Sequence, residues 1–250
     1  MSTITIQEAN FVDRMVNGKH RVKMPEFLAK HDSFDNWEPE RFDSMELHLR
    51  RGQVLFDVGA ETGHISAIYA RFVGPENMVM FESNPDNWQN IKATWDAEGL
   101  ADPRDTICAL VGTEDVSLTP TPDQFLHFDG ERWPLCALTG KIWTPRSYRY
   151  LHEHYGVTPR VSIDGYVEKT GNIPSAITID VEGAELEVLR GARKTLGLMR
   201  PTVWVSLHED LMRKHYKSCP RDIHNFMDSC GYGHMYLATD HEIHMMYVPR

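Results

Sequence analysis

The chain has 250 residues, of which 41% are hydrophobic and 25% charged, so it can bury the core of one α/β domain of ordinary globular composition. Its formal net charge of −10 argues against a dedicated surface for nucleic acid or anionic membrane, since both require clustered Lys and Arg. No apolar run approaches the roughly 18 residues of a membrane span, and the first residues lack the features of a signal peptide. The four cysteines form no CxxC pair. We therefore expect a cytoplasmic protein with reduced thiols, no nucleic-acid partner and no membrane attachment.

Apolar runs alternate with helical patterns from about residue 52 onward. Strands are expected over 54–56, 78–81, 107–111, 176–179 and 202–205, and two more between 233 and 248. Helices are expected over 65–72, from Asn84-Pro85 to about residue 95, over 186–196 and over 223–230. This alternation predicts an α/β fold, a mostly parallel sheet with helices on both faces and an antiparallel edge strand from the terminal hairpin.

Two regions lie outside the alternation. Residues 1–50 are expected to form a helical or irregular extension that packs on the sheet edge or over the site, before a domain that spans 51–250. Residues 114–160 are longer than an ordinary connection and rich in Trp, Tyr, His and Arg, which favours a lid or acceptor-binding insertion over a decorated surface loop. Within it, the segment 148–150 with His152 and His154 could contact an acceptor or be solvated surface.

A glycine-rich turn follows the first predicted strand. Gly59 and Gly63 allow a tight turn and a close approach of the backbone to a ligand, and the helix that starts near Gly63 offers free N–H groups to an anion. The second strand ends on Glu82, whose carboxylate can accept two hydrogen bonds from a ribose diol. Together these features predict a site for an adenosine-bearing cofactor. The alternatives are a plain strand-to-helix turn and, for Asp57, a buried cap acceptor.

Polar residues stand at the ends of several predicted strands. Asp57 ends the first strand, Glu82 the second and Asp180 the fourth, while the fifth reaches Ser206 and His208. In an open parallel sheet, ligands bind outside the carboxyl ends of the strands. We therefore expect these side chains to meet in one crevice.

The spacing Asp57-x-Gly59-x-x-x-Gly63 lacks the GxGxxG of a dinucleotide site and resembles the S-adenosylmethionine loop of class I methyltransferases. The resemblance implies that the loop contacts the methionine portion, that Glu82 takes the ribose hydroxyls, and that Ser83 and the end of the third strand line the adenine. The implied cofactor contacts are Asp57, Gly59, Ala60, Glu61, Thr62, Gly63, Glu82, Ser83, Ala109, Leu110 and Asp180.

The second half of the chain narrows the family. Residues 179–192 (IDVEGAELEVLRGA) closely resemble the signature of the FkbM-type methyltransferases, and residues 161–166 and 201–208 resemble the segments on either side of it. The resemblance covers roughly residues 52–210. It implies a Rossmann-like class I methyltransferase fold with a seven-stranded sheet, S-adenosylmethionine as cofactor, and O-methylation of a hydroxyl on a sugar or small natural product. The partner would then be a small-molecule or glycan acceptor.

Three positions depart from the pattern of that family. Glu61 stands where asparagine is usual, Thr178 stands where lysine is common, and Ser206 stands where glutamate often lies two residues before the histidine. For methyl transfer, we expect His208 or Asp180 to act as general base and Glu182 to orient the acceptor or the cofactor. The alternatives are a core histidine for His208 and, for Glu182, an acid favoured by a helix N-terminus.

Other functions stay open. We assign no metal ligands, although His241-x-x-His244 with Asp240 and Glu242 has a ligand-like spacing on what looks like an exposed strand. A nucleotide-sugar or NAD-linked oxidoreductase could use Glu82 on a ribose, but the absence of GxGxxG counts against it. A non-catalytic cofactor-binding or scaffold protein on the same fold is the third possibility, and Ser206 in place of an acid supports it.

Overall fold

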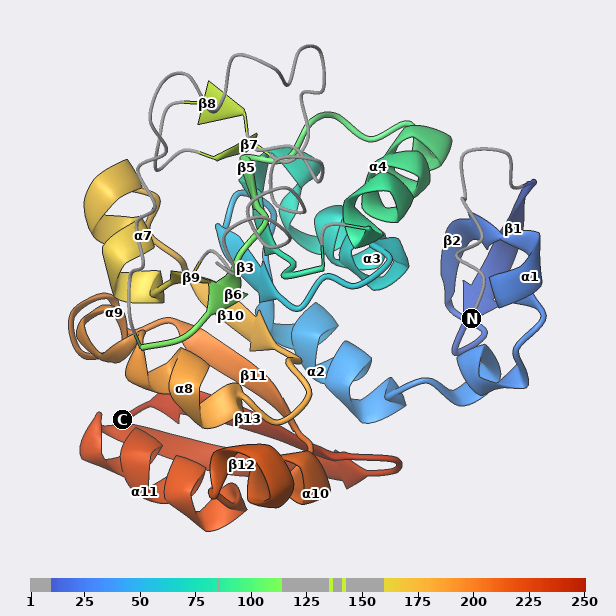
Figure 1. Ribbon diagram of the computed structural model, residues 1–250. Coiled ribbons are helices and arrows are strands. Elements are labelled where there is room, and N and C mark those ends of the chain that lie inside the picture. Colours follow the sequence, from blue (N-terminus) through green and yellow to red (C-terminus); the bar gives the residue numbers. More distant parts are fainter. Residues whose placement is uncertain (1–9, 85, 114–134, 137–140, 143–159) are drawn as a thin grey trace.

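A computed structural model describes residues 10–84, 86–113, 135–136, 141–142 and 160–250. Its centre is a seven-stranded sheet in the order β12-β13-β11-β10-β3-β4-β5 (Figure 1). The strands are β3 (Leu55–Val58), β4 (Met78–Phe81), β5 (Asp105–Ile107), β10 (Ala176–Ile179), β11 (Thr202–Leu207), β12 (Tyr232–Thr239) and β13 (Ile243–Pro249). In this sheet of described residues β13 alone runs opposite in direction to the other strands, and it lies one strand in from the edge. The mostly parallel seven-stranded sheet predicted from the sequence is therefore confirmed.

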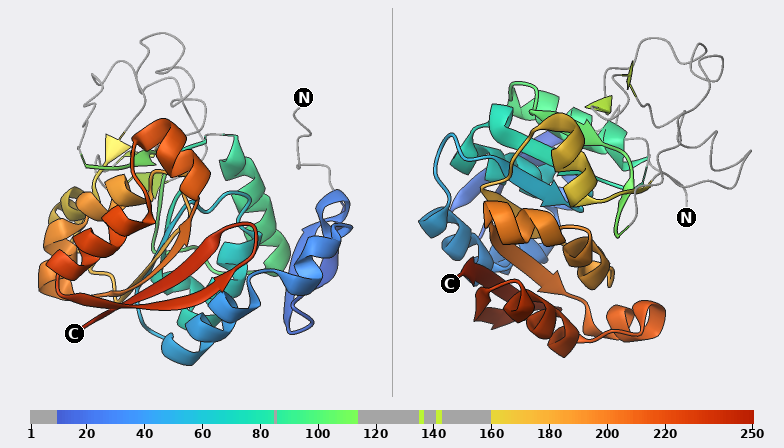
Figure 2. Two further views of the ribbon diagram at one scale, coloured as in Figure 1. Left: turned by 90° about the horizontal axis from the view of Figure 1, so that it is seen from below. Right: turned by 90° about the vertical axis from the view of Figure 1, so that its left-hand side faces the viewer.

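Helices cover both faces of the sheet (Figures 1 and 2). One face packs against α2 (Pro39–His48), α3 (His64–Val73) and α4 (Asn87–Glu98). The other packs against α7 (Ile163–Thr170), α8 (Glu185–Arg190), α9 (Arg193–Met199) and α11 (Pro220–Ser229). Because both faces are covered, the central strands are apolar at nearly every position, as their sequences indicated. Alternate residues of one strand go to different faces: Leu55 joins the first core and Phe56 the second.

Two predicted elements are each divided in the structure. The strand expected over 107–111 is wrong as one element: β5 ends at Ile107, and β6 (Leu110–Val111) pairs with β9 (Arg160–Val161) in a separate sheet. The helix expected over 186–196 is also wrong as one element, because α8 ends at Arg190 and α9 begins at Arg193. Between them Gly191 packs so closely on the chain that a Cβ there would lie 1.9 Å from the carbonyl oxygen of Gly112.

The N-terminal segment contains a hairpin that was not predicted. Strands β1 (Phe11–Val16) and β2 (His20–Pro25) are joined by Asn17, Gly18 and Lys19, and the φ angles of Asn17 and Gly18, 56° and 61°, are those a type I′ turn requires. An Asn-Gly pair between strand-like runs is the signal that was overlooked. The expectation of a purely helical or irregular extension is therefore corrected, although short helices do follow the hairpin. They are α1 (Glu26–Ala29), η2 (Asp32–Asn36) and α2.

The remaining described elements are short. They are η3 (Pro75–Asn77), β7 (Leu135–Cys136), β8 (Lys141–Ile142), α10 (Glu209–Leu211) and η4 (Met212–Tyr216). Most of the segment 114–160, with the candidate acceptor contacts at 148–154, lies outside the described residues. In the part of the chain that is described, no helix is long and apolar enough to cross a lipid bilayer.

Candidate active site

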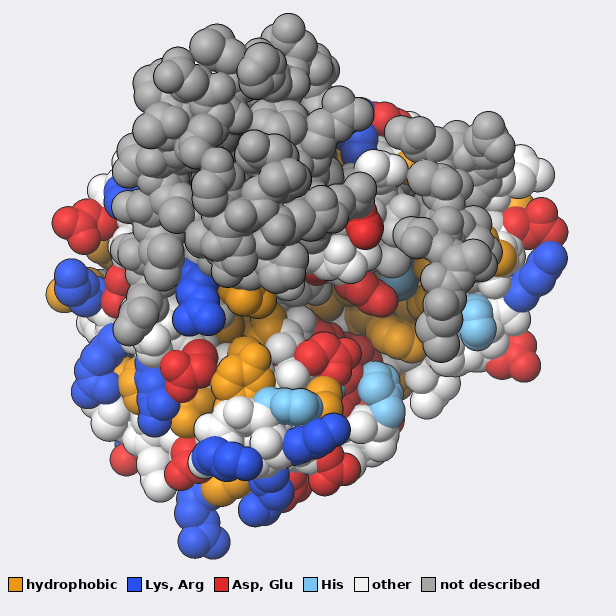
Figure 3. Space-filling view, in the orientation of Figure 1, with side chains coloured by type: hydrophobic (Ala, Val, Ile, Leu, Met, Phe, Trp, Pro, Cys, Tyr) orange, Lys and Arg blue, Asp and Glu red, His pale blue; other side chains and the backbone are white. Residues whose placement is uncertain are grey.

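A pocket with a volume of about 560 Å³ opens at the carboxyl ends of the parallel strands. Small-molecule sites commonly have volumes of about 300–1,000 Å³. Residues that follow four neighbouring strands line it, namely Gly59 after β3, Glu82 after β4, Asp180 after β10 and His208 after β11. Figure 3 shows acidic side chains and histidines close together near the centre of this face of the molecule. The crevice expected from the polar strand ends is thus present.

Most of the predicted site residues line this pocket. They are Gly59, Glu61, Glu82, Ser83, Ala109, Leu110, Asp180, Glu182 and His208. Asp57 and Ala60 line a smaller pocket of about 50 Å³ beside it, where Asp57 accepts a 2.6 Å hydrogen bond from Ser66 Oγ. Thr62 and Gly63 line neither. Gly63 precedes α3 with a φ of 79° and packs on α4, so its place in the loop is structural.

The loop after β3 is fitted directly onto the strand end that carries Asp180. Gly59 has a φ of 98°, and a Cβ built on it would lie 1.8 Å from the carbonyl oxygen of Asp180. Only glycine tolerates both this backbone conformation and this approach. The N–H of Gly59 also donates a 2.9 Å hydrogen bond to the carbonyl of Phe81 on β4. Gly59 therefore holds the ends of β4 and β10 at a fixed distance from the loop.

Main-chain donors fix the carboxylate of Glu82. Its Oε2 accepts a 2.9 Å hydrogen bond from the N–H of Glu61, and its Oε1 accepts a 2.6 Å hydrogen bond from the N–H of Asn84. Burial raises the pKa of Glu82, while these two hydrogen bonds act in the opposite direction. Each carboxylate oxygen has a second lone pair, so the group can still accept hydrogen bonds from a ligand in the pocket. Glu61 itself has a φ of 49°, a conformation in which asparagine is enriched.

His208 is oriented by one acid and faces three others. Its Nδ1 is 2.8 Å from Glu185 Oε1, which leaves Nε2 facing the pocket. Nε2 lies 3.0 Å from Glu242 Oε2 and 3.7 Å from both Asp180 Oδ1 and Glu182 Oε2. Burial alone would lower the pKa of His208, but the hydrogen bond to Glu185 and the charges of Glu242 and Asp180 raise it to about 9. These surroundings differ from those of a histidine packed in an apolar core.

Two other acids close to His208, Glu182 and Glu209, lie at the surface. The side chain of Glu182 is 75% exposed at the rim, and it lies before α8 rather than in its first turn, where Glu185 stands instead. The alternative interpretation of Glu182 as an acid in the first turn of a helix is therefore not supported. Glu209 forms an ion pair with Arg213 on the surface and does not line the pocket.

Beneath α2, the sheet carries a row of buried polar residues. Asp57 on β3 is opposite Thr178 on β10, and Ser206 on β11 is opposite His244 on β13. All four side chains are buried on the face that α2 covers. Buried hydroxyl groups require hydrogen-bond partners, and a residue of α2 supplies them to Thr178 and Ser206.

That residue is Arg41. Its guanidinium donates hydrogen bonds to Thr178 Oγ1 and, at 2.8 Å, to Ser206 Oγ. It also forms a 2.7 Å ion pair with Glu38 Oε2 and lies 3.5 Å from Asp180 Oδ2. The Arg41 side chain is only 4% exposed. Thus Arg41, itself paired with Glu38, brings a positive charge to Thr178 and Ser206, two of the positions at which the sequence departs from the family pattern.

Several residues at the site were not predicted from the sequence. They are Trp37, Glu38, Arg41 and Glu185, whereas Glu242 was noted for a ligand-like spacing but was not placed at this pocket. Thr178 and Ser206, two hydroxyls in otherwise apolar strands, were the available signal for a buried polar partner. Glu242 was expected on an exposed strand, but its side chain is only 4% exposed because it lies in the turn beneath the pocket.

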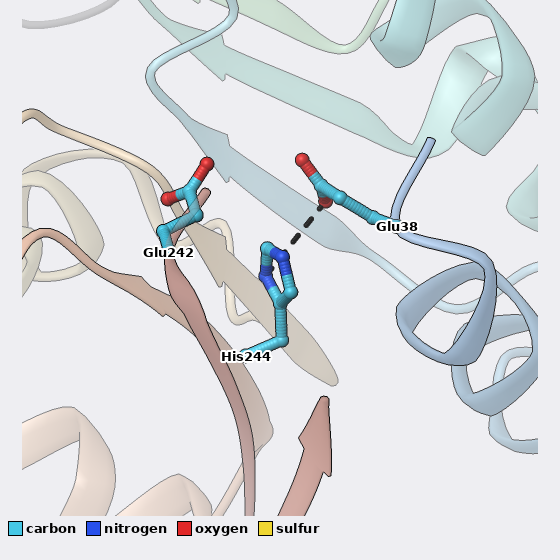
Figure 4. A group of neighbouring side chains, drawn as sticks. All are labelled: Glu38, Glu242 and His244. Atoms are coloured by element: carbon cyan, nitrogen blue, oxygen red, sulfur yellow. Dashed lines mark ion pairs between the residues drawn. The ribbon is translucent and has the colours of Figure 1, made fainter. Parts of the chain in front are cut away.

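The ligand-like spacing His241-x-x-His244 does not form one cluster. His241 is 53% exposed, whereas His244 is fully buried and lies 3.0 Å from Asp240. Among the described residues, no group of potential metal ligands contains both histidines. Figure 4 shows His244 instead between Glu242 and Glu38, which comes from the start of α2.

Comparison of the sequence with models of known protein families identifies one match. The sequence model described as the methyltransferase FkbM domain matches residues 57–233, more than half of the chain. The chain belongs to the FkbM methyltransferase family. The matched FkbM region runs from Asp57 in β3 to the start of β12, and it contains Glu82, Asp180 and His208. The family predicted from residues 179–192 is therefore confirmed. No curated protein sequence matches the chain.

The fold of this FkbM domain is found in a solved methyltransferase structure. The methyltransferase FkbM from Methylobacillus flagellatus KT aligns with a TM-score of 0.50 and 16% identity over 79% of this chain and 43% of that protein. A SAM-dependent methyltransferase from Aquifex aeolicus aligns with a TM-score of 0.47 and 10% identity over 89% of this chain and 95% of that protein. The chain thus spans less than half the length of the Methylobacillus protein. The architecture is a Rossmann-like methyltransferase fold, as predicted.

Proposed function

We propose that this protein is an S-adenosylmethionine-dependent methyltransferase that O-methylates a hydroxyl of a sugar or small natural product. The observation that carries the proposal is the fixed carboxylate of Glu82 in a pocket at the carboxyl ends of the strands of an FkbM domain. A carboxylate already oriented by two main-chain N–H groups needs no rearrangement to accept the hydroxyls of a ribose.

The rest of the pocket suits the other parts of the cofactor. Ser83, Ala109 and Leu110 line the side next to Glu82, where an adenine would lie. Glu61 and Asp180 line the wall formed by the glycine loop and provide negative charge for a cationic methionine portion. S-adenosylmethionine, when bound, supplies an activated methyl group on a positively charged sulfur.

The residues around His208 suit the removal of a proton from an acceptor. In O-methylation, a bond forms between the acceptor oxygen and the methyl carbon, the bond from sulfur to that carbon breaks, and the hydroxyl proton passes to a base. His208, when unprotonated, and Asp180 both face the pocket and can receive that proton. Glu182 at the exposed rim is placed to orient the acceptor.

Two alternative functions have less support. A non-catalytic protein on this fold was favoured by the serine at position 206, but Arg41, paired with Glu38, brings a charge to that position and weakens the argument. An NAD-linked oxidoreductase would need a loop that admits a pyrophosphate, and the spacing of Gly59 and Gly63 lacks the GxGxxG that does so.

Calorimetry followed by a transfer assay tests the proposal. We expect S-adenosylmethionine and S-adenosylhomocysteine to bind the wild-type chain and NAD not to bind. Labelled methyl groups should then pass to at least one member of a panel of hydroxylated acceptors and be recovered as an O-methyl product. Tight NAD binding without S-adenosylmethionine binding would contradict the proposal. Near-normal turnover in both His208→Ala and Asp180→Asn would overturn the assignment of the base.

A further inference from the structure

Three side chains with metal-ligand chemistry meet at the base of the pocket. Asp180 follows β10, His208 follows β11, and Glu242 lies in the turn before β13. One potential ligand atom from each lies within 4.8 Å of the other two. His208 Nε2 is 3.0 Å from Glu242 Oε2 and 3.7 Å from Asp180 Oδ1.

These separations are those of ligands around one ion. Oxygen ligands lie about 2.1 Å from an octahedral cation, so adjacent ligands are about 3 Å apart and opposite ligands about 4.2 Å apart. The distances from His208 Nε2 to the two carboxylate oxygens fall within this range. The three groups can therefore reach one cation with small side-chain movements.

The buried carboxylate of Glu242 independently indicates a ligand. Its side chain is only 4% exposed, and its Oε2 makes no hydrogen bond with any described residue. A buried carboxylate oxygen without a hydrogen-bond donor is costly unless a charge compensates it. In the metal-free chain His208, whose Nε2 lies 3.0 Å away, supplies that charge when it is protonated, and a bound cation would supply it when His208 is neutral. This oxygen faces His208 Nε2 at the wall of the pocket, where a bound ion would be in contact with it.

His208 is held in the manner of a metal-binding histidine. Its Nδ1 is 2.8 Å from Glu185 Oε1, and the Glu185 side chain is completely buried. Metal-binding histidines usually donate their other ring N–H to a carboxylate or carbonyl, which fixes the ring and presents the free nitrogen to the metal. Here that arrangement presents Nε2 to Asp180 and Glu242.

In a neighbouring group of possible ligands, two of the three side chains already have hydrogen-bond partners within the protein. The group consists of Glu38, Glu242 and His244, which Figure 4 shows together. Glu38 Oε2 accepts a hydrogen bond from Arg41, and His244 has Ser206 at Nδ1 and Asp240 at Nε2. The cation site therefore lies on the pocket side of Glu242, toward His208.

We propose that Asp180, His208 and Glu242 bind one divalent cation of the Mg²⁺/Mn²⁺ class, whose remaining positions open to the pocket. Two carboxylates favour a hard cation, and one imidazole makes Mn²⁺ a suitable member of that class. A bound cation lowers the pKa of an oxygen that it coordinates, so it would also assist the loss of a proton from an acceptor hydroxyl. With the cation bound, His208 Nε2 is a ligand, so the proton would then pass to a carboxylate at the pocket and not to His208. Both consequences rest on the proposed function, whereas the cation site itself does not.

The first test is a titration of the purified full chain with Mn²⁺ alone, without cofactor, followed by the electron paramagnetic resonance signal of free Mn²⁺. We expect one Mn²⁺ per chain, and we expect Glu242→Gln to weaken binding by more than about tenfold. The matched control is Glu209→Gln, because Glu209 adjoins His208 in sequence but is paired with Arg213 at the surface. Its affinity should stay within about twofold of wild type. A wild-type chain that leaves Mn²⁺ free, or a folded Glu242→Gln chain with unchanged affinity, overturns the proposal.

A second measurement does not depend on the folding of the Glu242 variant. Pulsed electron paramagnetic resonance of the wild-type chain with Mn²⁺ should show coupling to a coordinated imidazole nitrogen, and His208→Gln should remove it. Bound Mn²⁺ without that coupling contradicts the site. Calorimetry with S-adenosylmethionine on the same metal-free preparation separates the two proposals, because cofactor binding without Mn²⁺ binding refutes only the cation site.

Discussion

Arg41 donates a 2.8 Å hydrogen bond to Ser206, although 165 residues separate the two in the sequence. The bond joins α2, in the N-terminal segment, to β11 at the centre of the FkbM domain. Because both side chains are buried, the N-terminal segment provides part of the polar interior of the sheet face. Glu38 and Asp180 lie against the same guanidinium, so this contact also supports the wall of the pocket.

Removing the charge of Arg41 should destabilise the fold strongly. Arg41→Met would leave Glu38 without its buried partner, and the loss of one member of a buried pair costs about 3–5 kcal/mol of unfolding free energy. The matched control is Arg190→Met, because Arg190 and Glu187 have the same sequence spacing and the same 2.7 Å distance but are exposed. That exposed pair should contribute no more than about 1 kcal/mol. Urea unfolding of the two variants measures the difference, and equal effects would contradict the role assigned to Arg41.

A methyl group on Gly59 should separate the loop from Asp180. The Cβ of Gly59→Ala would lie 1.8 Å from the carbonyl oxygen of Asp180, so the backbone must move and the pocket must change shape. Gly52→Ala is the control, since Gly52 has a similar φ of 90° but nothing within 4 Å of the added atom. Backbone strain alone costs about 1–3 kcal/mol in either variant. Only Gly59→Ala should also lose cofactor affinity by calorimetry; equal affinities in the two variants would show that the close approach does not matter.

Neutralising Glu82 should weaken cofactor binding without unfolding the chain. In Glu82→Gln one of the two main-chain N–H groups loses its carboxylate acceptor, and the ribose hydroxyls lose a charged acceptor. A hydrogen bond to a charged group is worth about 1.5–3 kcal/mol, so affinity for S-adenosylmethionine should fall by roughly 10- to 100-fold. Glu98→Gln is the control, because the Glu98 side chain is 2% exposed and lies away from the pocket. Similar losses in both variants would point to general destabilisation instead.

The stability of the chain should depend on the ionisation of Asp105. Burial raises the pKa of Asp105 to about 6, against the effects of hydrogen bonds from Tyr166 and Thr106. An acid with a raised pKa in the folded state stabilises the fold when protonated, and that stabilisation is lost as the pH rises through the folded-state pKa. Relative to Asp105→Asn, the unfolding free energy of the wild-type chain should therefore fall by about 3 kcal/mol between pH values of about 3 and 7.

Denaturant unfolding across that pH range measures the effect. Asp102→Asn, an exposed substitution three residues earlier, is the control for a general change in charge. A constant difference between wild type and Asp105→Asn over the whole range would show that Asp105 does not titrate in the folded chain as proposed.

The central sheet and the cofactor side of the pocket could be predicted from the sequence because their signals are local. Met78–Phe81 and Ala176–Ile179 are apolar runs with polar residues immediately after them, and both form strands with the predicted bounds. The spacing from Gly59 to Glu82 indicates that a turn and a strand end meet, since parallel neighbours bring their carboxyl ends together.

The polar side of the pocket depends on contacts between distant segments. Nothing within the sequence of α2 shows that Arg41 will lie over Ser206, because that contact follows from how α2 crosses the sheet. The burial of Glu242 also depends on distant segments. Glu242 stands in a short turn, and it is buried because His208 and the strand ends lie against it. Local pattern also failed at residues 107–111, where Leu110 and Val111 leave the main sheet to pair with Arg160 and Val161.

The structure of this chain with S-adenosylhomocysteine bound tests the central claim most directly. The account predicts that the ribose hydroxyls lie within hydrogen-bond distance of the Glu82 carboxylate, with the adenine beside Ala109 and Leu110. The sulfur should then point toward Asp180 and His208. A ligand bound elsewhere, or a ribose turned away from Glu82, would contradict the assignment of this pocket as the methyl-donor site.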